Sequence, residues 1–111
     1  MIPQVRPGEF DEWVQGQAAR PVLLDVREPW ELQTASVQPE DVDVVAIPIQ
    51  EIPARLAEVP ADRPIACLCH HGMRSQRVAL FLAHQGYTDV ANVAGGIDAW
   101  ARERDSGVPL Y

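Results

Sequence analysis

Short apolar runs recur along this chain of 111 residues, and polar or turn-forming residues separate them. Four apolar runs have the length of strands: residues 22–24, 42–47, 65–68 and 90–93. The run at 22–24 is continuous up to Asp25, which indicates a strand buried on both faces, as in a parallel sheet. Val5 adds a candidate edge strand before the first run. The pattern therefore predicts a sheet of four strands with a further edge strand at Val5.

The segments between these runs carry apolar residues at helical spacing. They predict four helices, at residues 8–17, 49–59, 73–85 and 97–104, and a short helical turn at residues 28–32. The helix at 73–85 is the longest, and Gly86 lies where a helix C-terminal glycine belongs. Its apolar side is predicted to consist of Val78, Leu80, Phe81 and Leu82.

Strands and helices alternate along the chain, with the spacing of right-handed crossover connections. We therefore expect an α/β fold, in which helices cover both faces of a mainly parallel sheet, as one domain over residues 1–111. In such sheets, functional sites lie beyond the carboxyl ends of the strands. Residues 25–28 and 69–75 take that position here.

The composition excludes several classes of protein. A content of 47% hydrophobic and 23% charged residues is typical of a globular domain. No apolar run approaches the roughly 20 residues of a membrane-spanning helix, and residues 1–7 lack the order of a signal peptide. The net charge of −7 disfavours nucleic acid and anionic membranes as partners. Two cysteines fit a reducing compartment, so we expect a cytoplasmic protein and, without an evident apolar patch, a monomer.

The charge is distributed unevenly. Residues 63–88 contain no Asp or Glu but include three arginines and all of the histidines. A basic segment in an acidic protein is consistent with a site for a small anion, and also with a helix whose surface is basic. Charge alone favours the second interpretation.

Residues 65–75 combine a strand, a tight loop and the start of a helix, with Cys69 at the end of the strand. Backbone N–H groups at a helix start have no partner within the helix, and around Cys69 they would form an anion-binding nest. These groups and the helix dipole favour a thiolate. Gly72 permits the turn, while Arg74, His70 and His71 add positive potential at the rim. A cysteine nucleophile needs these features.

The size of the loop bears on the chemistry. Tyrosine-phosphatase-type loops place five residues between the cysteine and the arginine and cradle a phosphate. Here four residues separate Cys69 from Arg74. A tighter nest suits a smaller group, such as one additional sulfur atom on the cysteine.

Three motifs resemble those of rhodanese-domain sulfurtransferases, in the same order. CHHGMRS at 69–75 is similar to the active loop of the family, LLDVRE at 23–28 resembles its early strand-and-turn motif, and NVAGGIDAW at 92–100 resembles its closing segment. The resemblance is greatest to the small single-domain bacterial members. One departure is residues 34–37 and the acidic loop at 40–43, where the family often has a His-Ile-Pro-Gly-Ala-like segment.

The resemblance implies a five-stranded, mainly parallel sheet between helices, and a sulfur-transfer reaction. Cys69 would attack the outer sulfur of a small anionic donor such as thiosulfate, hold it as a persulfide and pass it to cyanide or another thiophilic acceptor. Arg74 would orient the donor, and no metal or organic cofactor would be required. The loop that binds the persulfide would consist of His70, His71, Gly72, Met73, Arg74 and Ser75.

Two other functions stay open. One is a non-catalytic module that carries sulfur to a partner protein or only binds it, and the presence of Cys69 disfavours pure binding. The other is a phosphatase or arsenate reductase on the same fold, which the short loop disfavours.

Several neighbouring residues are interpreted as structural. Asp25 and Arg27 flank the site and are expected to pair with each other, with the loop backbone or with Glu28, rather than with substrate. Cys67 lies two residues before Cys69 on the strand and is expected to be an inert core residue.

A metal site and a dinucleotide site are disfavoured by spacing. Cys67, Cys69, His70 and His71 lack the two separated ligand pairs of a zinc site. Residues 95–96, both glycine, lack the spacing of a dinucleotide-binding loop and predict a tight, closely packed turn.

Overall fold

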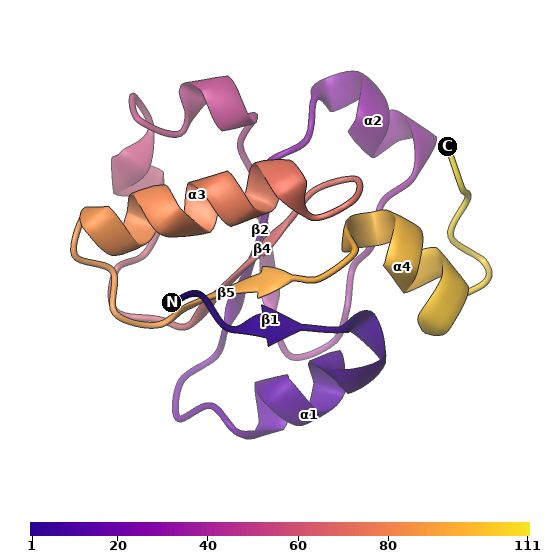
Figure 1. Cartoon of the computed structure of the whole chain (residues 1–111), viewed down its shortest axis with the longest axis horizontal. Helices are drawn as coiled ribbons and strands as arrows, with labels where there is room; N and C mark the ends of the chain where they lie inside the picture. Colours follow the sequence, from indigo (N-terminus) through magenta and orange to yellow (C-terminus); the bar gives the residue numbers. More distant parts are fainter.

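The sheet has five strands in the order β1-β5-β4-β2-β3, and every neighbouring pair is parallel. Figure 1 shows α3 (Met73–His84) on one side of the strands and α1 (Phe10–Gln15) on the other. The computed structural model describes residues 1–111. Its strands are β1 (Gln4–Val5), β2 (Val22–Asp25), β3 (Asp43–Ala46), β4 (Ile65–Leu68) and β5 (Val90–Val93). The expected α/β fold is confirmed, and β1 is the predicted edge strand.

Helices cover both faces of this sheet. One face carries α3 (Met73–His84) and the short 3₁₀ turns η2 (Ile49–Glu51) and η3 (Leu56–Glu58). The other face carries η1 (Pro7–Glu9), α1 (Phe10–Gln15) and α4 (Gly96–Glu103), while α2 (Pro29–Thr34) follows β2. None of these helices combines the length and the apolar character that crossing a membrane requires.

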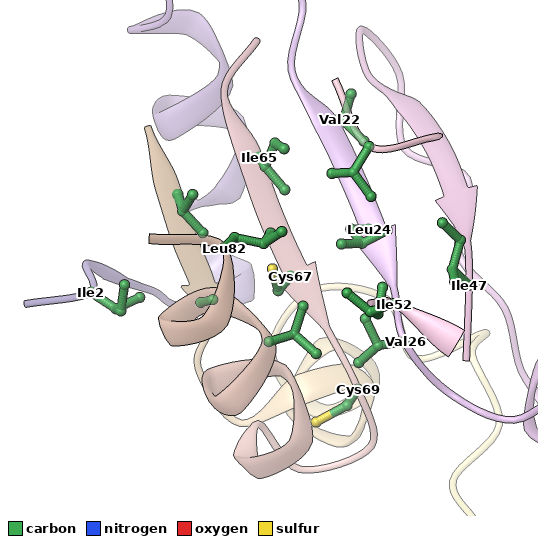
Figure 2. Close-up of a cluster of buried hydrophobic side chains, with 14 residues drawn as sticks. Ile2, Val22, Leu24, Val26, Ile47, Ile52, Ile65, Cys67, Cys69 and Leu82 are labelled. Carbon is green, nitrogen blue, oxygen red and sulfur yellow. The ribbon is translucent and has the colours of Figure 1, made fainter. Parts of the chain in front are cut away.

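Two apolar clusters fill the space between the sheet and its helices. Side chains alternate along each strand, so Leu24 and Cys67 face one cluster whereas Leu23 and Ala66 face the other. Figure 2 shows the first cluster, with Leu82 of α3 packed over the strands and Cys69 beyond the end of β4. The strand β2 is buried along its whole length, as predicted, and so are β4 and β5. The strand β3 lies at the edge of the sheet and is exposed or half-buried.

The prediction of a helix over residues 49–59 is wrong. The segment forms the two 3₁₀ turns η2 and η3 instead. Pro53 lies between them, and a proline has no N–H to donate and clashes with the carbonyl four residues earlier. The apolar residues of the segment still reach the core, because Ile52 and Val59 are buried.

Two smaller expectations also need correction. The predicted helix at 8–17 begins as the 3₁₀ turn η1, and only Phe10–Gln15 is α-helical. On α3, Leu80 is 44% exposed and does not belong to the apolar side. Ala79 is buried there instead, together with Val78 and Leu82.

The two segments predicted to carry the site lie at the same edge of the sheet. Strands β2 and β4 are neighbours, with Asp25 opposite Leu68 in the register. Residues 25–28 and 69–75 therefore leave the sheet next to each other at its carboxyl edge.

Candidate functional site

Cys69 lies between the end of β4 and the start of α3, and its residue is only 1% exposed. Its Sγ accepts a hydrogen bond from the backbone N–H of Gly72 at 3.1 Å and lies 3.2 Å from the Ser75 hydroxyl. The loop thus curls back over its own cysteine, and α3 begins beside the sulfur atom.

Other loop amides in this turn have no acceptor within the protein. The N–H groups without one belong to His70, His71, Met73, Arg74 and Ser75. Two of these donors precede the twelve-residue helix α3 and three open it, and they are the groups from which the predicted nest for negative charge would be built.

Glycine is required at two points of this arrangement. Gly72 has φ of +100°, and a Cβ there would lie 3.0 Å from the backbone nitrogen of Gly95. Gly96 has φ of +63°, and a Cβ there would lie 2.4 Å from the carbonyl oxygen of His70. The loop and the start of α4 are therefore in backbone contact, which confirms the close packing predicted for residues 95–96.

Backbone hydrogen bonds join α4 to the same loop. The N–H of Ile97 donates to the carbonyl of Cys69 at 2.9 Å, and the N–H of Asp98 donates to that of His70 at 3.0 Å. Ile97 and Asp98 lie in the first turn of α4, where N–H groups have no acceptor within the helix, and the loop carbonyls serve as their acceptors.

Ser75 and Asn92 form a buried polar pair beside the sulfur. The Ser75 Oγ lies 2.5 Å from Oδ1 of Asn92, and Nδ2 of Asn92 donates to the Gly72 carbonyl at 3.1 Å and to Gln4 Oε1 at 2.9 Å. These two donor contacts make Oδ1 an acceptor. The single hydroxyl proton of Ser75 therefore points either to Asn92 or to Cys69, but not to both.

Arg74 makes a bidentate ion pair with Glu31. The two guanidinium N–H contacts are 2.7 and 2.8 Å long, and the side chain of Arg74 is 31% exposed. Glu31 is buried, and its hydrogen bonds with Arg74 chiefly lower its pKa to about 2. Arg74 was expected at the rim to orient a donor, and here Glu31 already occupies two of its five donors.

Asp25 and Arg27 confirm the structural interpretation. Arg27 is fully buried and donates to both carboxylate oxygens of Asp25, at 2.9 and 2.7 Å. It also donates to the Glu31 carbonyl and to the Tyr111 hydroxyl, at 3.3 and 3.0 Å. Its guanidinium therefore links the end of β2 to α2 and to Tyr111, and it does not face the surface.

His70 lies in a stack of three rings. The centroids of His71 and Tyr111 are each 3.8 Å from that of His70. Burial and the neighbouring His71 lower the pKa of His70, which favours the neutral imidazole. Tyr111 also donates its hydroxyl to Glu31 at 2.8 Å, and burial raises its pKa to about 12.

The remaining predicted residues lie apart from these contacts. Met73, the first residue of α3, is 73% exposed. Cys67 faces the core, and burial raises the pKa of its thiol far above the usual range. This burial in the core agrees with an inert Cys67, and both cysteines are free thiols.

Three contributors to the site escaped sequence reasoning: Glu31, Asn92 and Tyr111. Glu31 read as part of a short helical turn and Asn92 as part of an apolar strand. The only available signal was chemical, because a polar Asn inside a buried strand needs a partner. Nothing in the sequence indicated that Tyr111 returns to the loop.

Comparison with known sequences places this geometry in a family. Residues 7–103 match the rhodanese-like domain. A sulfurtransferase of Allochromatium vinosum is 37% identical over 89 residues, which cover 80% of this chain and 77% of that protein. The thiosulfate sulfurtransferase GlpE of Pseudomonas syringae is 35% identical over 89 residues, covering 78% of this chain and 80% of that protein.

Solved structures also match this chain. A rhodanese-related protein from Thermoplasma volcanium matches with a TM-score of 0.77 and 29% identity, over 98% of this chain and 99% of that one. The reduced CoADR-RHD protein of Bacillus anthracis matches with a TM-score of 0.79 and 33% identity, over 99% of this chain but only 18% of that longer one. The cysteine loop, the parallel sheet and these matches agree, and the chain belongs to the rhodanese-like domain family.

Proposed function

We propose that this protein is a thiosulfate sulfurtransferase, which moves sulfane sulfur from thiosulfate or a related donor to a thiophilic acceptor through a persulfide on Cys69. Its sulfurtransferase relatives support a sulfur-transfer function in general. The observation that carries the finer proposal is the set of unpartnered loop amides around the Cys69 sulfur.

The first half-reaction loads the cysteine. The Cys69 thiolate attacks the outer sulfur of thiosulfate, and a new S–S bond forms while the S–S bond of the donor breaks. The bonding electron pair leaves with sulfite. The loop amides stabilise the negative charge that remains on the persulfide, as backbone N–H groups do for anions at helix starts.

The second half-reaction empties the cysteine. A thiophilic acceptor such as cyanide attacks the outer sulfur and forms thiocyanate, and the electron pair of the broken S–S bond returns to Cys69 as a thiolate. Both steps exchange one sulfur atom between nucleophiles. We therefore propose that the reaction needs no metal and no organic cofactor.

Ser75 and Arg74 take separate parts in this scheme. When Cys69 carries charge, the Ser75 hydroxyl turns from Asn92 to the sulfur and donates to it. Arg74 keeps three of its donors free while Glu31 holds it in place, and these donors meet the anionic donor molecule.

Intact-mass spectrometry tests the proposal. Wild type, Cys69→Ser and the matched control Cys67→Ser are incubated with thiosulfate, and then with cyanide. We expect one added sulfur on wild type and Cys67→Ser, removed by cyanide, and none on Cys69→Ser. No adduct on wild type from thiosulfate, from a small-molecule persulfide or from mercaptopyruvate would refute the proposal.

A sulfur-carrier module is the second candidate function. The match to one fifth of the CoADR-RHD protein shows this domain type within a longer chain, where it is combined with other segments. A carrier would load sulfur on Cys69 but release it slowly to cyanide and rapidly to a protein acceptor. The rate of the cyanide step in the same experiment separates the two candidates.

A further inference from the structure

His70, His71 and Asp98 bring three potential metal ligands together at the rim of the loop. One ligand atom of each lies within 4.8 Å of the other two. His70 and His71 belong to the cysteine loop, and Asp98 belongs to the first turn of α4. Neither cysteine takes part, so this set differs from the Cys and His set that the sequence spacing disfavoured.

The backbone fixes two of the three ligands relative to each other. The N–H of Asp98 donates to the His70 carbonyl at 3.0 Å, and Gly96 packs directly on that carbonyl. Tyr111 stacks on the His70 ring and limits its rotation. The backbones of residues 70 and 98 are therefore held at a set separation, and the Asp98 side chain can turn from that fixed point.

His70 has a buried nitrogen without a partner. Its Nε2 is inaccessible to solvent and makes no hydrogen bond within the protein. A buried polar atom without a partner is unfavourable, and a bound ion is a partner that would satisfy it.

The other two ligands have the freedom to complete a site. Arg102 donates to Oδ2 of Asp98 at 3.1 Å, and Oδ1 makes no hydrogen bond. His71 is exposed, so its ring can turn toward the ion. Ligand atoms around zinc lie roughly 2.0–2.1 Å from the ion, so the three must close by an ångström or more, which rotation of His71 and Asp98 supplies.

We propose that His70, His71 and Asp98 bind one divalent first-row transition metal ion, Zn²⁺ foremost, at the rim of the Cys69 loop. Two imidazoles and one carboxylate suit such ions and do not suit Mg²⁺ or Ca²⁺, which take oxygen ligands. The inference rests on these three side chains and does not depend on the proposed sulfur transfer.

Calorimetric titration with Zn²⁺ on tag-free protein tests this site. A Cys67→Ser, Cys69→Ser background removes thiolates, which bind the same ion, and visible absorption of added Co²⁺ reports the ligand set independently. We expect one site, weakened at least about tenfold by His71→Ala and by Asp98→Asn, because even outer partners of a ligand carry about that effect. His84→Ala, at an exposed histidine on α3, should leave the affinity unchanged.

Three results would overturn the proposal: no saturable binding tighter than about 1 mM, equal binding by His71→Ala and Asp98→Asn, or loss of binding in His84→Ala. Circular dichroism of each variant confirms that it is folded. Because His71 is exposed and Asp98 bonds only to Arg102 through its side chain, neither change removes a core contact.

Discussion

At the scale of single residues, the hydrogen bonding of the Cys69 sulfur depends on the hydroxyl proton of Ser75. Cys69 and Asn92 compete for that proton. Ser75 is fully buried, and its Oγ lies within bonding distance of both Cys69 and Asn92. A hydroxyl donating to a charged group contributes more than one donating to a neutral amide. Charge on the sulfur therefore draws the proton away from Asn92.

Ser75→Ala should make Cys69 a poorer nucleophile, because the thiolate loses that donor. A hydrogen bond to a charged group is worth about 1.5–3 kcal/mol, so we expect alkylation of Cys69 to slow by roughly tenfold or more. The rate of reaction with iodoacetamide in a Cys67→Ser background measures this. Ser106→Ala, at an exposed serine, serves as the control, and an unchanged rate in Ser75→Ala would show that the amides act alone.

Glu31→Gln should destabilise the fold, since it leaves Arg74 with a weaker partner. Removal of one member of a buried pair costs about 3 kcal/mol, at the lower end of the usual range because Arg74 is partly exposed. Chemical denaturation at neutral pH measures the difference in the free energy of unfolding. Glu12→Gln, at an exposed glutamate, should have little effect.

The same pair predicts a pH dependence. The pKa of Glu31 is lowered from 4.5 to about 2 in the folded state, so the unfolded state takes up its proton first as the pH falls. The stabilisation is complete above about pH 5 and is lost progressively toward about pH 2. The difference in unfolding free energy between wild type and Glu31→Gln should shrink over that interval, and a constant difference would contradict the assignment.

At the scale of elements, the site is the junction of one loop with the starts of two helices. Gly72, the N-cap of α3, donates its N–H to the sulfur, and the first turn of α4 donates to the carbonyls of Cys69 and His70. The contact between Gly96 and His70 leaves no room for a side chain. The junction therefore couples the position of α4 to the shape of the nest.

Gly96→Ala should disturb this junction. The left-handed backbone costs a non-glycine residue about 1–2 kcal/mol, and the clash with the His70 carbonyl adds to it. We expect a lower midpoint of thermal unfolding and slower sulfur loading of Cys69. Gly8→Ala is the matched control, because nothing lies within 4 Å of a Cβ at that position.

The sequence predicts elements that local apolar patterns determine, and it does not predict contacts between residues far apart in the chain. The strands at 65–68 and 90–93 and the start of α3 follow from local apolar patterns and match the structure. The helix at 49–59 failed because Pro53 outweighs the apolar spacing. Pairing of Arg74 with Glu31 joins residues 43 positions apart, and no local pattern encodes such a contact.

At the scale of the whole molecule, the segment after α4 returns to the loop. Tyr111 contacts His70 through its ring, and Arg27 and Glu31 through its hydroxyl. Trp30 of α2 meets the same ring edge-on. One aromatic residue thus joins the early strand-and-turn segment to the cysteine loop.

Tyr111→Phe and Tyr111→Ala should separate the two contributions of this residue. The Phe variant keeps the stacking and loses the hydroxyl contacts, so we expect a loss of about 1 kcal/mol of stability. The Ala variant loses both and should also increase the access of alkylating agents to Cys69. Denaturant unfolding and alkylation rates measure the two effects, and identical behaviour of the two variants would exclude a role for the ring.

The origin of the contacts around Cys69 has a consequence for folding kinetics. Polar partners of the loop come from both ends of the chain, since Gln4 bonds Asn92 across 88 positions and Tyr111 bonds Arg27 across 84. Closing such long loops is entropically expensive and occurs late on a folding pathway. A refolding chain should therefore complete β2, β4 and α3 before Cys69 becomes reactive. The time at which Cys69 becomes reactive then reports the last step of folding, and pulsed alkylation during refolding measures it.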